Sequence, residues 1–181
     1  MEIRKALPAH FTSIMSIADK QLGHSYIDLD LYYNTESIVL VAILEGQVVG
    51  FCTGFRVSLP DLHLRIPSLS VLKTKQHKGR GFIGYVESIA TDPSRQGKGI
   101  ASALLDKCVY WLENKQVSAV FMTGWKSSSG VHIKGLARRS GFEEVAQINN
   151  FWHKQSLVKK YQCPECGAPP CLCSAVVFVR Q

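Results

Sequence analysis

The sequence predicts an α/β (α+β) fold, in which helices flank a central sheet. With 181 residues, of which 46% are hydrophobic, the chain can build a packed core, and we expect a single domain over residues 1–181. Two β-rich segments, Ser37–Leu44 and residues 47–59, are separated only by Glu45-Gly46, a pair typical of hairpin turns. Residues 82–114 then read as a strand, a glycine loop and an amphipathic helix.

The N-terminal part predicts a strand and a helix. Residues 2–7 favour a strand, which Pro8 ends. Apolar side chains recur at helical spacing between residues 9 and 22, and Gly23 closes this helix. A less regular segment follows at residues 25–33 and is rich in tyrosine, including Tyr26.

The connection after the second hairpin strand is unusually long. Residues 60–80 stand where a short turn is expected, and such loops inside compact domains are usually functional or disordered. Leu62, Leu64 and Ile66 alternate with polar residues, and a basic run follows between Lys73 and Arg80. We expect an insertion at about 60–81 near the active-site face, with the basic run solvated rather than docking a partner.

The central segment predicts an anion site. Phe82–Thr91 is a strand rich in β-branched and aromatic residues, and Asp92-Pro93 ends it. A loop at residues 95–101 leads into a helix that carries apolar residues at three- and four-residue spacing. Glycines let a phosphate approach the backbone, and the first helical amides point at it. Arg95 and Lys98 add positive charge.

Two common phosphate motifs do not fit this loop. A P-loop requires Ser or Thr directly after its lysine, but Lys98 is followed by Gly99. A dinucleotide fingerprint requires a third glycine where this chain has Ser102. The pattern that remains is Gln96-x-x-Gly99-x-Ala101.

This pattern resembles the Gln/Arg-x-x-Gly-x-Gly/Ala signature of the GNAT superfamily of N-acetyltransferases, which binds the pyrophosphate of acetyl-coenzyme A. The stretches around Ile43–Phe51 and Gly135–Phe142 are also similar to family segments, so the resemblance covers roughly residues 1–155. It implies a mixed, mostly antiparallel sheet of about seven strands with about four helices and splayed central strands. It also implies that residues 25–33 line the acceptor site, although core and rim packing explains their aromatic residues equally well.

By the same resemblance, acetyl-CoA is the cosubstrate and an amine is the acceptor. The residues implied in acetyl-CoA binding are Ile89, Ala90, Thr91, Gln96, Gly97, Lys98, Gly99, Ile100, Ala101 and Ser102. The backbone amide of Ile89 or Ala90 is the implied oxyanion donor. We expect Glu87, two residues before Ile89 and so on the same strand face, to act as the base or to be an ordinary polar residue.

One departure from the family concerns the leaving group. Many members carry a tyrosine four residues before the glycine of the Gly-Phe pair, where it protonates the departing thiolate. Here that position is Ala137. We expect His132 to replace it from the same helix, one turn before Leu136, or the thiolate to leave without a side-chain acid. Tyr161 and His153 are further candidates near the acceptor wall.

The C-terminal part predicts strands and a metal site. We expect a strand at 117–125, a polar turn whose serines cap a helix ending near Ser140, a strand at 143–155 and a last strand at Ser174–Arg180. Between the last two strands lie four cysteines, Cys163, Cys166, Cys171 and Cys173. Four thiolates at this spacing predict a structural zinc ion, with disulfides, free thiols or, less favoured by the spacing, an iron–sulfur cluster as alternatives. Cys52 and Cys108 are expected in the core.

Composition limits the partners. The net charge of +7 suits the phosphates of coenzyme A as well as nucleic acid. The sequence shows no signal-like segment and no apolar run of membrane-spanning length, so we expect a cytoplasmic protein without membrane contact. The acceptor is a small molecule or a protein amine, and a homodimer is possible. A non-catalytic acyl-CoA-binding regulator and, less favoured, a nucleic-acid-binding protein are the alternative functions.

Overall fold

The computed structural model describes residues 1–27, 34–67, 81–128 and 130–181. One sheet has the strand order β1-β2-β3-β4-β5-β8-β7, and the short β6 pairs with the end of β5. The strands are β1 (Glu2–Lys5), β2 (Ser37–Leu44), β3 (Gln47–Val57), β4 (Phe82–Thr91), β5 (Val117–Ser127), β6 (Gly130–Val131), β7 (Glu143–Ile148) and β8 (Ser174–Arg180). The helices are α1 (Phe11–Gln21), α2 (Leu59–Arg65), α3 (Ile100–Glu113), α4 (Lys134–Arg139) and α5 (His153–Lys159). The predicted α/β class with a mostly antiparallel sheet is therefore confirmed.

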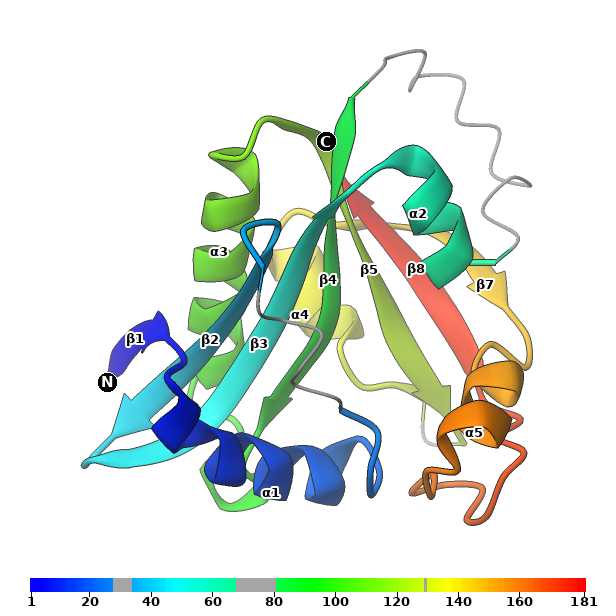
Figure 1. The fold of residues 1–181 in the computed structure, drawn as a ribbon, viewed down its shortest axis with the longest axis horizontal. Coiled ribbons are helices and arrows are strands. Elements are labelled where there is room, and N and C mark those ends of the chain that lie inside the picture. Colours follow the sequence, from blue (N-terminus) through cyan, green and yellow to red (C-terminus); the bar gives the residue numbers. More distant parts are fainter. Residues whose placement is uncertain (28–33, 68–80, 129) are drawn as a thin grey trace.

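Helices cover both faces of the sheet (Figure 1). On one face, α1 and α2 bury Ile14 and Leu62 in a core that also contains Phe51 and Tyr85 of the sheet. On the other face, α3 packs its apolar stripe, including Leu104 and Cys108, against a second core. Cys52 lies in that second core as well, so both isolated cysteines are buried as expected.

The predicted insertion begins as a helix. The sequence predicted only a long connection here, but α2 starts at Leu59 with Ser58 as its N-cap, whose hydroxyl accepts a hydrogen bond from the Asp61 amide. Four-residue spacing buries Leu62 and Ile66 completely and leaves Leu64 exposed. The basic run from Lys73 to Arg80 lies outside the described residues.

Two predictions for the C-terminal part are wrong. Residues 143–155 do not form one strand: β7 ends at Ile148, Asn150 adopts a positive φ of 53°, and α5 follows. The predicted serine cap is not present at the start of α4, because β6 pairs with β5 after the turn and α4 begins at Lys134 without a side-chain cap. His132 therefore precedes α4 rather than lying on it.

The sheet opens at its centre. β4 and β5 are parallel and pair from Phe82 and Val117 up to Val86 and Met122, and among the described residues no ladder pair joins them further along. Figure 1 shows the two strands diverging toward their C-terminal ends. There β5 keeps its other partner, β8, through the pair Lys126 and Ser174. The expected splay is thus present, and it leaves one edge of β4 open inside the molecule.

A β-bulge lies on β4 at the same point. Thr53 of β3 pairs with Ser88, but the next residue of β3, Gly54, pairs with Val86, so Glu87 has no counterpart in the ladder. This irregularity changes which side chains face each core.

No helix in the described part of the chain is long and apolar enough to cross a membrane.

Candidate active site

A cleft of about 730 Å³ follows the opening between β4 and β5. One end is formed by the start of α3 and the loop before it, and the other by Tyr26, Trp152 and Pro164. Residues Val86 to Thr91 of β4 form a side of the cleft along its length. Clefts at such points in a sheet are the usual places for ligands.

The α3 end has the features of an anion cradle. Gly97 and Gly99 both have φ of 76°, a conformation that glycine adopts without strain, and no atom lies within 4 Å of a Cβ placed on either. Gly99 is the N-cap of the 14-residue α3, whose first amides have no partner within the helix. The start of α3 therefore offers free backbone N–H groups beside open space, where an anion can bind.

Most of the predicted acetyl-CoA residues line the cleft. Ile89, Ala90, Thr91, Gln96, Gly97, Gly99, Ile100, Ala101 and Ser102 are all in its wall. Lys98 is exposed and is not among the lining residues, whereas Arg95 and Arg139 are. Arg139 was not predicted; it follows the α4 glycine by four residues and adds its positive charge to those of Lys20 and Arg95 in the cleft wall.

The loop itself is held by Asp92. Its carboxylate accepts hydrogen bonds from the Ser94 amide at 2.9 Å and the Ser94 hydroxyl at 2.6 Å. These bonds hold the pKa of Asp92 below its usual range. Nearby, the Thr91 hydroxyl is buried and has no hydrogen-bond partner within the described ranges. Because buried hydroxyls are nearly always satisfied, this group is available to a ligand or to water in the cleft.

Glu87 lies in the middle of the cleft. Its carboxylate contacts the guanidinium of Arg65 in α2 at 2.8 Å, and Arg65 in turn lies 4.1 Å above the Phe55 ring. The prediction that Glu87 and Ile89 share a strand face is wrong because the bulge interrupts the alternation. Glu87 faces α2, on the side of the sheet where Tyr85 and Ala90 join the core of α1 and α2. Ile89 instead packs on the opposite side, toward the core of α3. The role of Arg65 could not be identified from the sequence, because its contact with β4 depends on where α2 packs in the folded protein.

Aromatic side chains form the far end of the cleft. Tyr26 stands edge-on to Tyr161 at a centroid distance of 5.2 Å, and Trp152 is part of the same cluster. Burial and then the neighbouring Glu87 carboxylate raise the pKa of Tyr26, so its hydroxyl stays protonated at neutral pH. Residues 28–33 of this predicted acceptor segment lie outside the described residues. Trp152 was expected on a strand, and the sequence prediction did not place it in the site.

His132 reaches the cleft from the β5 side. Its Nε2 is 3.0 Å from the Ser127 hydroxyl, and its ring is 5.7 Å from that of Trp125. Ala137 is fully buried in the core under α4 rather than in the cleft wall. Of the other candidates, Tyr161 is buried behind Tyr26, and His153 begins α5 and is not a lining residue.

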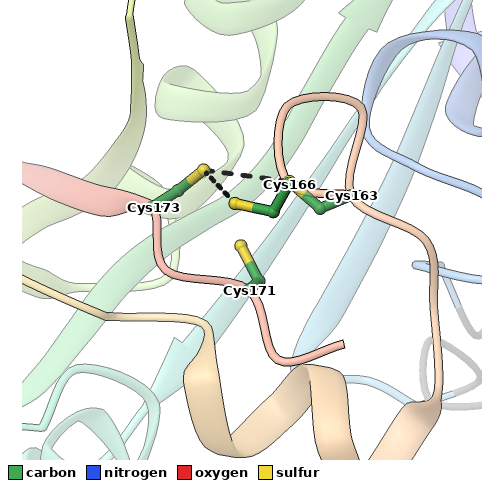
Figure 2. Close-up of side chains that lie close together, drawn as sticks. All are labelled: Cys163, Cys166, Cys171 and Cys173. Carbon is green, nitrogen blue, oxygen red and sulfur yellow. Dashed lines mark hydrogen bonds between the residues drawn. The ribbon is translucent and has the colours of Figure 1, made fainter. Parts of the chain in front are cut away.

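The four cysteines converge as predicted (Figure 2). Their sulfur atoms all lie within 4.8 Å of one another, with Cys166 to Cys173 at 3.4 Å and Cys163 to Cys173 at 3.8 Å. Tetrahedral zinc with Zn–S bonds of about 2.3 Å places its sulfurs about 3.8 Å apart. The four sulfurs therefore fit a single metal ion, and no disulfide joins the described cysteines.

Comparison with known proteins agrees with this geometry. The sequence profile of the Acetyltransferase (GNAT) family matches residues 7–142. NAA60 of Arabidopsis thaliana, solved in complex with acetyl-CoA, has a TM-score of 0.70 at 15% identity, over 98% of this chain and 96% of that one. The ribosomal-protein-alanine N-acetyltransferase of Brucella melitensis has a TM-score of 0.65 at 18% identity, over 99% of both chains. No curated protein matches the sequence significantly. Since the profile spans most of the chain, this protein belongs to the Acetyltransferase (GNAT) family.

Proposed function

We propose that the protein transfers the acetyl group of acetyl-CoA to an amine by direct attack within a ternary complex. One observation carries the proposal: the sheet opens beyond Val86, so that the anion cradle at Gly99 and the carboxylate of Glu87 face one continuous cleft. A phosphate-bearing donor and a protonated amine would each meet complementary groups there. Acetyltransferase activity agrees with the family, and acetyl-CoA is the ligand of the Arabidopsis thaliana neighbour.

The donor would lie along β4. In this proposal the first-turn amides of α3 and the two loop glycines bind the pyrophosphate, with Gln96, Ala101 and Ser102 around it. The arm of coenzyme A follows the open edge of β4 past Thr91, whose buried hydroxyl lacks a partner among the described residues. Backbone groups on that edge need hydrogen bonds, and an amide-containing arm can supply them.

The acetyl transfer would take place beside the bulge. Glu87, directly or through a water molecule, removes a proton from the acceptor ammonium, and the freed nitrogen attacks the thioester carbonyl carbon. The backbone amide of Ile89 or Ala90 stabilises the tetrahedral oxyanion. The C–S bond then breaks as the nitrogen releases its second proton to solvent, which gives the amide product, and the thiolate of coenzyme A takes a proton from His132 or from solvent.

A panel of amines tests the proposal. We expect release of free coenzyme A thiol from acetyl-CoA with at least one acceptor among small amines, amino acids, aminoglycosides and peptides with free α-amines. Peptides are included because the Brucella melitensis neighbour is named for acting on a ribosomal-protein alanine. The same assay with His132→Gln is expected to slow turnover if this side chain donates the proton, and to leave it unchanged if solvent does.

The alternative is an acyl-CoA-binding protein without turnover. The observation that favours it is that position 137 of α4 is a buried alanine, where many family members have the tyrosine that protonates the thiolate. The alternative predicts acetyl-CoA binding in calorimetry with no thiol release across the whole panel. A protein that does not bind acetyl-CoA at all would contradict both proposals.

Gly99→Ala should weaken acetyl-CoA binding by roughly tenfold or more, because its methyl group would enter the space where the phosphates meet the α3 amides. Gly46→Ala is the matched control: Gly46 has the same φ of 76° and the same open surroundings, but it lies in the hairpin turn between β2 and β3. Both changes carry a similar backbone cost. If the Gly99→Ala and Gly46→Ala variants have equal dissociation constants for acetyl-CoA in calorimetry, the loop does not bind the donor.

A further inference from the structure

The cysteine-bearing turn contacts both walls of the cleft. We define the knuckle as residues 162–167, which includes Cys163 and Cys166. The turn is closed by two backbone hydrogen bonds between Cys163 and Gly167, at 2.9 and 2.8 Å. Pro164, inside the knuckle, lines the far end of the cleft. The knuckle is therefore a compact unit placed where β4 and β5 have separated.

One side of the knuckle is joined to the segment after α1. The Gln162 amide donates a hydrogen bond to the His24 carbonyl at 3.3 Å. Gly23 has a φ of 117°, and a Cβ on it would overlap the Gln162 carbonyl oxygen and contact Pro164 at 3.4 Å. Glycine at this position is thus required both by its conformation and by the closeness of the two backbones. Tyr26, three residues along, belongs to the acceptor end.

The other side of the knuckle is joined to the end of β5. The Glu165 carboxylate accepts a hydrogen bond from the Ser128 amide at 3.1 Å. Ser128 directly follows Ser127, whose hydroxyl lies 3.0 Å from His132 Nε2. This contact links the knuckle to the wall that carries the proposed proton donor.

The cysteines connect the knuckle to the sheet. Cys166 and Cys163 of the knuckle face Cys173, which directly precedes β8 (Figure 2). Cys171 is anchored separately, since its amide donates to the Ser156 hydroxyl of α5 at 2.8 Å. A metal ion bound by all four sulfurs would fix the knuckle to β8 and α5 at once.

We propose that the metal-bound knuckle is a bracket that sets the width of the acceptor end of the cleft, with Gln162 and Glu165 as its two arms. Beyond Val86 no ladder bond among the described residues holds β4 and β5 together, so the spacing of the two walls must come from another connection. The knuckle supplies one, from the segment after α1 to the end of β5. Glu165 acts here as a positioning residue. The catalytic part of this proposal rests on the proposed acetyl transfer.

Hydrogen exchange of the full-length protein tests the bracket without any acceptor. Glu165→Gln keeps all four cysteines but weakens the arm to Ser128, so exchange of the amides of Ser128, Gly130 and Val131 should rise about tenfold, the effect of losing one charge-assisted hydrogen bond. Removing the metal with a chelator should raise exchange there and also at residues 23–27. Leu172→Ala, between two cysteines but with a side chain that is 58% exposed, is the control and should change neither segment.

Steady-state kinetics test the functional consequence. With the acceptor found in the amine panel, Glu165→Gln is expected to raise the acceptor KM about tenfold while the dissociation constant for acetyl-CoA stays within about twofold. Zinc content should remain at one ion per chain in this variant. Gly23→Ala, which displaces the other arm, should give the same pattern.

The outcomes separate the bracket from the proposed function. Wild-type exchange rates at both segments in the Glu165→Gln and metal-free proteins would overturn the bracket, whatever the activity. Faster exchange with an unchanged acceptor KM would restrict the knuckle to stability and contradict its role in acceptor binding. Absence of any acetyl transfer by the unmodified protein would contradict the proposed function and leave the exchange result to decide the bracket.

Discussion

Glu87→Gln is expected to lower kcat for acetyl transfer by about 100-fold, the usual loss when a general base is removed. The amide keeps the size and hydrogen-bonding capacity of the side chain but cannot accept the proton of an ammonium. The effect should shrink when the reaction is assayed at high pH, where the free amine is already abundant. Acetyl-CoA binding should be unchanged, because the carboxylate lies in the middle of the cleft beside Arg65 of α2, and not at the α3 end.

The matched control for this change is Glu36→Gln. Glu36 also pairs with an arginine, Arg56, at 2.7 Å, but it is not among the cleft-lining residues. Loss of an arginine-paired carboxylate is thus common to both variants, and only Glu87→Gln removes a group from the cleft. Similar kcat values for the two variants would show that Glu87 serves the Arg65 pair and not proton transfer.

Cys171→Ser is expected to abolish metal binding and lower Tm by roughly 10 °C, because the free energy of metal binding contributes to folding. Cys171 is 2% exposed and lies between the knuckle and α5, so the substitution removes the buried ligand on the α5 side of the site. Elemental analysis should change from about one zinc per chain to near zero. The unmodified protein should show the same fall in Tm after prolonged treatment with a chelator.

Cys52→Ala controls for the loss of a buried thiol. Cys52 is fully buried but lies in the α3 core, away from the four-cysteine cluster. The substitution should cost only the packing of one sulfur atom and leave the zinc content unchanged. If the unmodified protein contains no metal and its four cluster thiols all react with a thiol reagent in the native state, the metal site is wrong.

Strands were the most predictable part of the fold. The bounds of β2, β4 and β8 coincide with the sequence prediction, because runs of β-branched and aromatic residues end at clear breaks such as Asp92-Pro93. Short helices were less predictable. α2 and α5 have seven residues each, too few for a helical period to stand out from alternation, and tertiary packing decides their conformation.

The candidate site was predictable where it depends on local sequence. The anion cradle follows from two glycines before an amphipathic helix, and the cysteine cluster follows from spacing. The environment of Glu87 was not predictable, since the bulge arises from the pairing of β4 with β3, and Arg65 comes from a helix more than twenty residues away. Such contacts depend on the assembled sheet and leave no pattern in the local sequence.

The position of Cys173 has a consequence for the alignment of β8. This strand fills the space between β5 and β7, and its first residue, Ser174, pairs with Lys126. A slip of one residue would reverse the two faces of β8 and turn Phe178 out of its core. Because Cys173 directly precedes the strand, coordination of its sulfur would hold the first ladder pair in register. The same ion would thus fix the register of β8 in the sheet.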